Sequence, residues 1–463
     1  MKDDLGSNKL HLKRGPRWCV YILILLSSMF SALDGTIFNT AITWVKEDLK
    51  FTNEDYGLFS SMLFVGKIVG AFGFIFLLNL INRKYLFVLS MLMSGGGMIV
   101  YTMCSGKYIL YTVRFILGFF NVFFIIYSPV WIDQYGIRKY KTLMITSIQI
   151  TMPIGGIIGS VMGTYLHWRV ALRVTACFLV IEGLALFCIS SDYFSNKIYS
   201  SMSPSQAKDY TVPSIYEIMV KKEETKEKKD ENNNHSIFGL LKNKTFLVYA
   251  FSRSFLLFPL IASSTFINDY FQNVLGVNDK SVRLGVLTAL SLSGTLLGSI
   301  IGGIIGTLIG GYQNKRASIA LIFLQIISAV SSIIVPYMNT LFTFAILFGI
   351  NMTFISAIMP IITGMVITSV PNEQRAMANS LTSLIVNLFG MMPGPYIYGK
   401  LNTLYDDKDP RFPMKVVHYV SLVCLALFIV GALLKYGEKQ IFNEEKEEGT
   451  ALKDIKENEN NKV

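Results

Sequence analysis

Charged residues are scarce in this chain: of 463 residues, 16% are charged and 52% are hydrophobic. Soluble domains carry about 25% charged residues. The mean hydropathy of +0.46 is correspondingly high. This composition favours an integral membrane protein over a soluble one. The five cysteines lie in or beside apolar stretches, and no pair is placed for a disulfide outside the membrane, so we expect them to be packing residues.

Signatures of enzymatic chemistry are missing as well. The sequence has no Gly-rich phosphate loop, so we expect no transport driven by ATP hydrolysis. Its four histidines are scattered without metal-ligand spacing. We therefore expect no enzyme activity, no cofactor and no metal site. A cleavable signal peptide is not expected either, because the first apolar run is too long and lacks a small-residue cleavage site.

The chain contains about twelve long apolar stretches. About 20 residues of helix cross a hydrocarbon core of about 30 Å, and in lipid the backbone must satisfy its own hydrogen bonds. We therefore predict an all-α membrane protein with about twelve transmembrane helices in two six-helix halves. The expected spans are near 18–45, 56–81, 85–104, 108–134, 141–166, 170–191, 245–275, 284–311, 316–338, 340–370, 376–401 and 414–436.

Polar segments divide these spans into two groups of six. The Lys and Arg clusters fall on one side of the membrane if the spans alternate in direction, which predicts that both termini are cytoplasmic. The net charge of +11 is then a topology signal and not a nucleic-acid signal. The expected parts are a cytoplasmic N-terminus (1–17), an N-terminal half (18–191), a largely disordered cytoplasmic linker (192–244), a C-terminal half (245–437) and a disordered cytoplasmic tail (438–463).

Two rows of glycines recur at every fourth position. Such small-residue rows let helix backbones approach closely in lipid. The rows either line the seam between the two halves or pack helices within one half. They are Gly155, Gly159 and Gly163 in the fifth span, and Gly294, Gly298 and Gly302 in the eighth.

Local motifs resemble the spinster branch of the major facilitator superfamily. They include Asp34, Arg114-x-x-x-Gly118, Trp168–Val174 and Pro395-Tyr396-x-x-Gly399. The resemblance implies a facilitator fold, in which the fifth and eighth helices face each other across the boundary between halves. It also implies export of a lysophospholipid or related amphipathic lipid, with or without proton coupling. One departure from the branch pattern is Gly35, which stands where the branch usually has an arginine.

The other departure is Asn121, which stands where the branch has a glutamate, so half of the implied proton-coupling set is missing. The cytoplasmic gate that the facilitator pattern implies has five charged residues here. They are Asp133, Arg83, Lys84, Lys315 and Arg316.

Ionisable residues inside the spans are costly, so each is expected to face the protein interior and to have a partner. Asp34 and Lys67 lie near the middle of consecutive antiparallel helices, where an ion pair is plausible. With Asn121 in place of a carboxylate, a substrate phosphate or carboxylate becomes the more attractive partner for the Arg114 guanidinium. Arg253 is either a second anion contact or a snorkelling cation.

Two acidic residues are candidates for carrying protons. They are Glu182 in the sixth span and Asp269 late in the seventh.

The leading interpretation is a secondary active or facilitative transporter that works by alternating access on a small amphipathic substrate. A small organic anion or drug carrier of the same fold is the alternative, and a nutrient sensor without net transport is an alternative of another class. The lipid bilayer and, in the coupled case, protons are the other expected partners; nucleic acid is not. We expect a monomer in a lysosomal or vacuolar membrane, another endomembrane or the plasma membrane.

Overall fold

The computed structural model describes residues 14–135, 141–194, 237–309, 315–370, 375–405 and 407–460. These residues form helices and short connections, and no strand occurs among them. Ten of the described helices are long and apolar enough to cross a membrane. The predicted all-α membrane fold is therefore confirmed.

The N-terminal half consists of six long helices and one short helix. The short helix, α2, follows the first long one after a break at Ala41. The helices are α1 (Arg14–Thr40), α2 (Ile42–Leu49), α3 (Asn53–Leu80), α4 (Arg83–Met103), α5 (Lys107–Tyr135), α6 (Lys141–Tyr165) and α7 (Trp168–Cys188), followed by the 3-10 turn η2 (Ser191–Phe194).

The C-terminal half repeats this pattern with two of its rods interrupted by π-helical segments. One rod is α12 (Lys280–Leu290), η5 (Ser291–Leu297) and α13 (Gly298–Leu308); the other is α16 (Arg375–Val386), η8 (Asn387–Met391) and α17 (Pro393–Tyr405). The remaining helices are α10 (Ile237–Lys242), α11 (Lys244–Asn273), α14 (Lys315–Ile334), the 3-10 turn η6 (Val335–Tyr337), α15 (Leu341–Thr368) and α18 (Phe412–Asn460).

Local sequence explains several helix boundaries. α3 starts with a capping box: the Thr52 hydroxyl accepts from the Asp55 backbone N–H at 3.1 Å, and the Asp55 carboxylate accepts from the Thr52 N–H at 2.9 Å. The first predicted span, near 18–45, is shorter as a helix, because the chain turns at Ala41 into α2. Lys50 ends α2 in the left-handed region (φ 53°).

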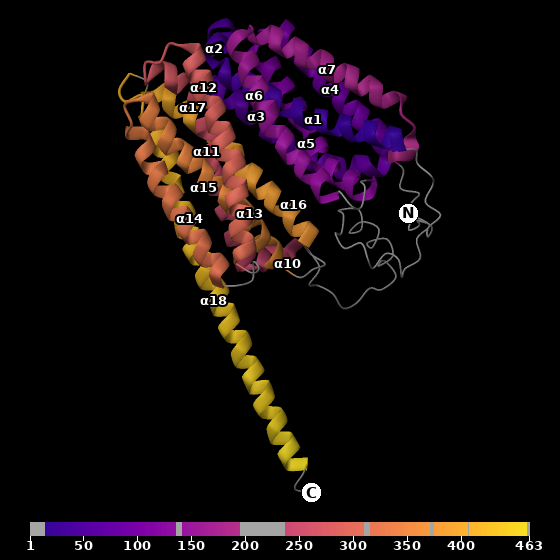
Figure 1. The fold of residues 1–463 in the computed structure, drawn as a ribbon, viewed down its shortest axis with the longest axis vertical. Helices are drawn as coiled ribbons and strands as arrows, with labels where there is room; N and C mark the ends of the chain where they lie inside the picture. The colour runs from indigo at the N-terminus through magenta and orange to yellow at the C-terminus, as the bar shows by residue number, and fades with distance from the viewer. Residues whose placement is uncertain are drawn as a thin grey trace.

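The tail after Glu438 differs from the prediction. It continues α18 as helix to Asn460 and projects beyond the bundle (Figure 1). The segment contains many Glu and Lys residues, which are good helix formers in spite of their charge. The predicted linker lies mostly outside the described residues, as does the predicted N-terminal segment.

Helices pair within each half and touch across the boundary in a symmetric way (Figure 1). In the first half α1 packs on α6, α3 on α5 and α4 on α7; in the second, α11 packs on α18 and α14 on α15. Across the boundary, α3 packs on α17, α6 on α12 and η5, and α1 on α11. The fifth and eighth spans thus face each other as the resemblance implies.

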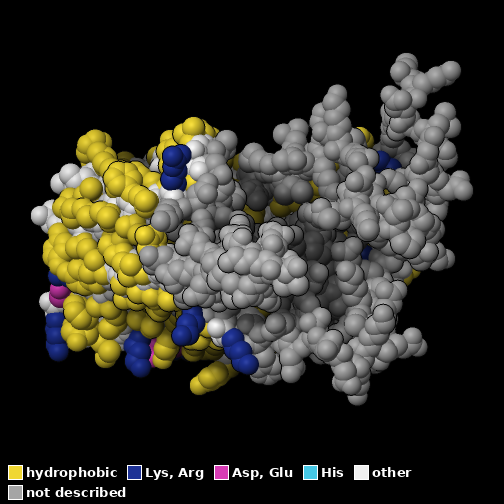
Figure 2. All heavy atoms as spheres, turned by 90° about the horizontal axis from the view of Figure 1, so that it is seen from below, with side chains coloured by type: hydrophobic (Ala, Val, Ile, Leu, Met, Phe, Trp, Pro, Cys, Tyr) yellow, Lys and Arg dark blue, Asp and Glu magenta, His cyan; other side chains and the backbone are white. Residues whose placement is uncertain are grey.

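Large apolar side chains are exposed along the outer helices. On α14 they recur at helical spacing, with Ile319, Phe323 and Val330 each more than half exposed. The end view in Figure 2 shows hydrophobic side chains covering the left flank, where Figure 1 places the C-terminal half. Lys and Arg side chains lie at its rim. Such a surface suits lipid contact, so the chain is an integral multi-pass membrane protein.

Candidate functional site

The two halves share a hydrophobic core at only one end of the described bundle. We call this the α2 end, because α2 lies there, and we call the other end, where α1 begins and α18 leaves the bundle, the terminal end (Figure 1). The shared core joins Phe38 and Tyr56 to Phe266 and Tyr398 of the other half. Tyr56 meets Phe266 with ring centroids 5.6 Å apart, and Phe266 stacks on Tyr398 at 4.7 Å.

Toward the terminal end, each half has a core of its own. One cluster contains buried side chains of the N-terminal half only, from α1, α3, α4, α5, α6, α7 and η2, and the other contains side chains of the C-terminal half only. The described halves are therefore closed against each other at the α2 end and are not joined by a common core at the terminal end.

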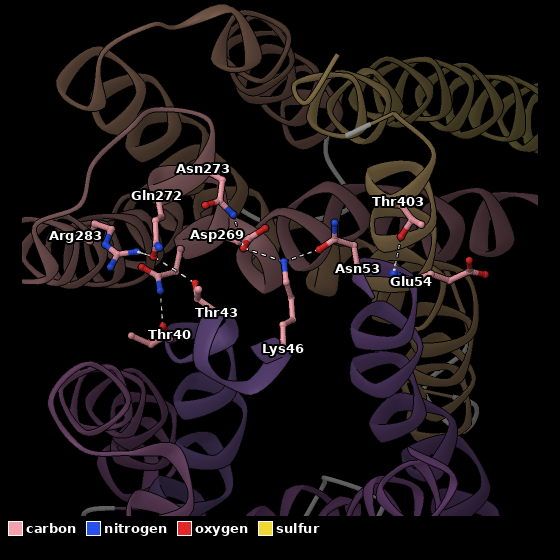
Figure 3. Close-up of polar contacts among 11 residues, drawn as sticks. Thr40, Thr43, Lys46, Asn53, Glu54, Asp269, Gln272, Asn273, Arg283 and Thr403 are labelled. Carbon is pink, nitrogen blue, oxygen red and sulfur yellow. Dashed lines mark hydrogen bonds and ion pairs between the residues drawn. The ribbon is translucent and has the colours of Figure 1, made fainter. Parts of the chain in front are cut away.

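A polar layer covers the shared core at the α2 end (Figure 3). Lys46 of α2 forms an ion pair with Asp269 of α11 at 3.0 Å and donates to Asn53 at 2.6 Å. Asn273 donates to the same Asp269 oxygen at 3.0 Å. Asp269, which the sequence suggested as a proton carrier, thus pairs with a residue of the other half, and Lys46 is a boundary residue that sequence reasoning missed.

Further bonds extend this layer along the boundary. The Thr43 hydroxyl donates to the Gln272 side-chain oxygen at 3.3 Å, and Arg283 donates to the same oxygen at 2.5 Å (Figure 3). The Asn268 amide donates to the Thr40 carbonyl. A small cleft lies beside these groups, lined by residues of both halves. We call the Lys46–Asp269 and Thr43–Gln272 contacts the α2-end gate.

A buried ion pair lies beneath this gate in the N-terminal half. Arg114 of α5 donates to Asp34 of α1 at 2.7 Å, and both side chains are at most 3% exposed. The second Asp34 oxygen, Oδ1, and the Arg114 Nε are buried and accept or donate no hydrogen bond among the described residues. The pair is thus electrostatically matched, yet it retains unused hydrogen-bonding capacity.

Aromatic rings surround the guanidinium of this pair. The Arg114 carbon Cζ lies 4.9 Å from the ring centroids of both Phe38 and Phe59. These two rings pack edge to face at 4.9 Å, and Tyr101 packs against both. Cation–π attraction adds to the ion pair in such a dry setting.

The partner of Asp34 is therefore Arg114 and not Lys67. The expected Asp34–Lys67 ion pair is absent from the described contacts, and Lys67 lies instead over the Phe64 ring, 5.3 Å from its centroid. The reason is that α1 contacts α5 directly, so Arg114 reaches Asp34 first. Lys67 is half-buried and within electrostatic reach of the pair. Two cations beside one carboxylate leave one positive charge uncompensated.

The other predicted interior residues lie apart from this pair. Asn121 accepts from the Ser94 hydroxyl at 3.1 Å, and Glu182 Oε1 lies 2.8 Å from the Ser27 hydroxyl oxygen; both side chains are buried. Arg253 is half-buried, and its Nε has no partner among the described residues. The structure thus brings Asp34, Arg114 and Lys67 together and leaves Asn121, Glu182 and Arg253 elsewhere.

The glycine rows pack helices within one half, so the interdomain interpretation of them is wrong. A Cβ on Gly159 would strike Thr36 of α1, and a Cβ on Gly298 would strike the Thr353 carbonyl of α15. The remaining ladder glycines follow the same pattern: Gly155 faces Met29, Gly163 faces Ile37, Gly294 faces Met352 and Gly302 faces Ala357. A row spaced at i+4 marks a close helix contact but does not identify the partner.

Two other glycines form the close contact between halves. A Cβ on Gly57 of α3 would strike the Pro395 carbonyl of α17, and a Cβ on Gly399 would strike the Asn53 carbonyl. The backbones of α3 and α17 therefore cross almost in contact. Gly399 belongs to one of the motifs that carry the family resemblance, but no spacing pattern marked either glycine as a residue of the boundary between halves.

The predicted cytoplasmic gate is only partly within the described side chains. Lys84 donates to the Phe187 carbonyl of α7 at 2.8 Å, a contact within its own half. Arg83 is buried and Arg316 is exposed. The side chains of Asp133 and Lys315 lie outside the described set.

Comparison with known proteins agrees with this architecture. A family model of the Major Facilitator Superfamily matches residues 24–395, so the chain belongs to that superfamily. No curated protein matches the sequence. The fold is similar to a bacterial homologue of the human lysosomal transporter Spinster in an inward-facing, unoccupied conformation, with a TM-score of 0.71 and 13% identity over 91% of this chain and 98% of that one.

Two further structures share the fold. The same homologue in an inward-facing, occupied conformation has a TM-score of 0.64 and 13% identity over 93% of this chain and 98% of that one. The nucleoside transporter NupG has a TM-score of 0.67 and 16% identity over 90% of this chain and 99% of that one. At these identities the likeness concerns the fold. The chain is a transporter-fold protein of the major facilitator superfamily.

Proposed function

We propose that this chain is a spinster-like secondary transporter that works by alternating access as a monomer and carries a lysophospholipid or a related amphipathic anion or zwitterion. The observation that supports this most is the unequal joining of the halves. They share a core and a polar gate at the α2 end, whereas each has its own core toward the terminal end. Alternating access requires halves that can meet at one end at a time.

The distribution of basic residues supports an orientation. Among the described residues, Arg83, Lys84, Lys244 and Arg316 stand at the starts of α4, α11 and α14 at the terminal end, where α1 also begins and α18 leaves the bundle; on the positive-inside rule this end faces the cytoplasm. The described conformation then corresponds to an inward-facing transporter. The positive-inside rule sets orientation in the same way in the plasma membrane and in an endomembrane.

The interior charges support an anionic or zwitterionic headgroup. Lys67 lies beside the Asp34–Arg114 pair, and Arg253 adds a cation from the other half. An anionic group would compensate this positive charge, and Lys67 on the α3 face that carries Tyr56 and Ser60 is well placed to meet it first. The cation over Phe64 also has apolar surface beside it for an acyl chain.

Counterflow in proteoliposomes tests this proposal. Purified protein preloaded with unlabelled lysophosphatidylcholine should accumulate labelled lysophosphatidylcholine, and small carboxylates should compete poorly. Lys67→Ala should weaken competition by anionic lipids, with Lys67→Arg as the charge-preserving control. Preference for small carboxylates would favour an organic anion or drug carrier, and ligand binding without any counterflow would favour a sensor.

A further inference from the structure

Glu182 is a buried carboxyl that the proposed transport path does not use. It lies on α7 and is 4% exposed, and its Oε2 has no hydrogen-bond partner among the described residues. Its one polar contact there is with Ser27 of α1, whose hydroxyl oxygen lies 2.8 Å from Glu182 Oε1. An ionised carboxylate in a membrane interior needs a cation or several donors. Glu182 has neither among the described side chains.

The Ser27 hydroxyl shows how a proton is held there. Its oxygen also lies 2.7 Å from the Leu23 carbonyl oxygen. A hydroxyl has a single proton to donate, and a carbonyl oxygen can only accept. When Ser27 donates to Leu23, as serines in apolar helices commonly do, its short contact with Glu182 requires a proton on the carboxyl. With a neutral acid the Leu23 carbonyl, the Ser27 hydroxyl and Glu182 Oε1 all take part in a hydrogen bond, whereas with an ionised carboxylate the single Ser27 proton serves only one of the two oxygens.

The charged groups on the neighbouring helices lie away from Glu182. On α1 they are Arg14, whose side chain is not among those described, and Arg17 and Asp34, each about two helical turns or more from Ser27. On α4, Lys84 donates to the Phe187 carbonyl, more than a turn beyond Glu182, and Arg83 lies beside it in sequence. On α7 itself Arg169 binds Asp48 at the α2 end, with Arg173 one turn further on. The side chain of Lys141, at the start of α6, is not among those described.

We propose that Glu182 is the proton-binding site of this transporter, holding one proton in the inward-facing conformation and releasing it when α1 moves. Ser27 connects the carboxyl to the conformational change, because α1 contacts α7 in its own half and also contacts α11 of the opposite half. Movement between the halves would shift Ser27 relative to Glu182 and change what the carboxyl can bond. This inference rests on the proposed transport function, but it places the coupling proton on Glu182 and not on the Asp34–Arg114 pair.

The first experiment measures the proton directly. Infrared spectra of the purified wild-type protein at neutral pH should contain a protonated-carboxyl C=O band. Difference spectra between wild type and each variant should show this band to be absent in Glu182→Gln and shifted in Ser27→Ala. Thr175→Val, which removes a hydroxyl bonded to its own helix on the same face of α7, is the matched control and should retain the band. A spectrum in which Glu182→Gln leaves the protonated-carboxyl region unchanged overturns the proposal.

The second experiment separates coupling from transport. Wild-type proteoliposomes should accumulate lysophosphatidylcholine under an imposed pH gradient, and Glu182→Gln should lose that accumulation entirely while counterflow at equal pH persists. If wild type shows counterflow but ignores the gradient, or if Glu182→Gln still accumulates substrate, the proton site is refuted while the transport function stands. Absence of counterflow in wild type instead contradicts the proposed function, and the infrared result then decides the proton site alone.

Discussion

At the scale of single residues, substituting either member of the buried Asp34–Arg114 pair is expected to lower the stability of the protein. Removing either partner leaves an unmatched buried charge, which costs about 3–5 kcal/mol in soluble proteins. Arg114→Gln and Asp34→Asn should therefore each lower the melting temperature clearly, whereas the double variant Asp34→Asn/Arg114→Gln should recover most of the loss. Thermal unfolding in detergent measures this cycle. Equal stability of all four proteins would contradict a structural role for the pair.

The same two residues show what sequence can and cannot predict. Mid-span charges stand out in a chain with so few of them, so Asp34, Lys67 and Arg114 were found from hydropathy alone. The pairing of Asp34 with Arg114 was not predicted, because it depends on which helices touch. α1 packs on α5, and this contact joins two residues that lie 80 positions apart in the sequence. The contact between Lys46 and Asp269 gave no local signal either, since the two residues lie 223 positions apart and meet only across the boundary.

At the scale of helices, the glycine rows should act on stability and not on the rocking of the halves. Gly298→Ala places a methyl group against the α15 backbone, whereas Gly303→Ala, one turn away on the same helix, meets nothing within 4 Å. We expect Gly298→Ala to lower the melting temperature by several degrees and Gly303→Ala to leave it unchanged. Thermal unfolding of the two variants side by side measures the difference; a harmless Gly298→Ala would mean that α13 and α15 do not pack closely.

Gly399 is the glycine expected to affect conformational change. An alanine there presses on the Asn53 backbone only while α3 and α17 are crossed at the α2 end. Gly399→Ala should therefore favour conformations in which this end is open, and a cysteine introduced at Thr43 should react faster with a water-soluble maleimide. Gly156→Ala, whose methyl group would make an ordinary contact at 3.6 Å, serves as the control. An unchanged rate of maleimide labelling at position 43 would mean that the α3–α17 crossing does not control opening of the α2 end.

The helices themselves were predicted well and their interruptions were not. Long apolar runs define the rods, but the π-helical segments η5 and η8 depend on tertiary packing of the rods in which they lie. The break before α2 also escaped prediction, because residues 41–45 are apolar enough to continue the first span.

At the scale of the whole molecule, covalent closure of the α2-end gate should stop transport. Thr43→Cys with Gln272→Cys, in a background without the native cysteines, places two thiols where side chains now bond across the halves at 3.3 Å. Oxidation or a short thiol crosslinker should abolish counterflow, and reduction should restore it after oxidation. Asn339→Cys with Arg411→Cys, a contact within the C-terminal half, should crosslink without loss of counterflow. Full counterflow in the crosslinked gate variant would exclude opening at this end.

The shared aromatic core at the α2 end also sets how the conformational equilibrium responds to temperature. Opening that end must transfer the rings of Tyr56, Phe266 and Tyr398 from a dry contact into water. Hydration of apolar surface raises the heat capacity by about 0.45 cal/K/mol for each Å² exposed. The open form therefore has the larger heat capacity, and apolar burial holds the α2 end shut less strongly as the temperature falls. Cold should accordingly enrich the population in which the α2 end is open, a shift opposite in sign to simple freezing of motion.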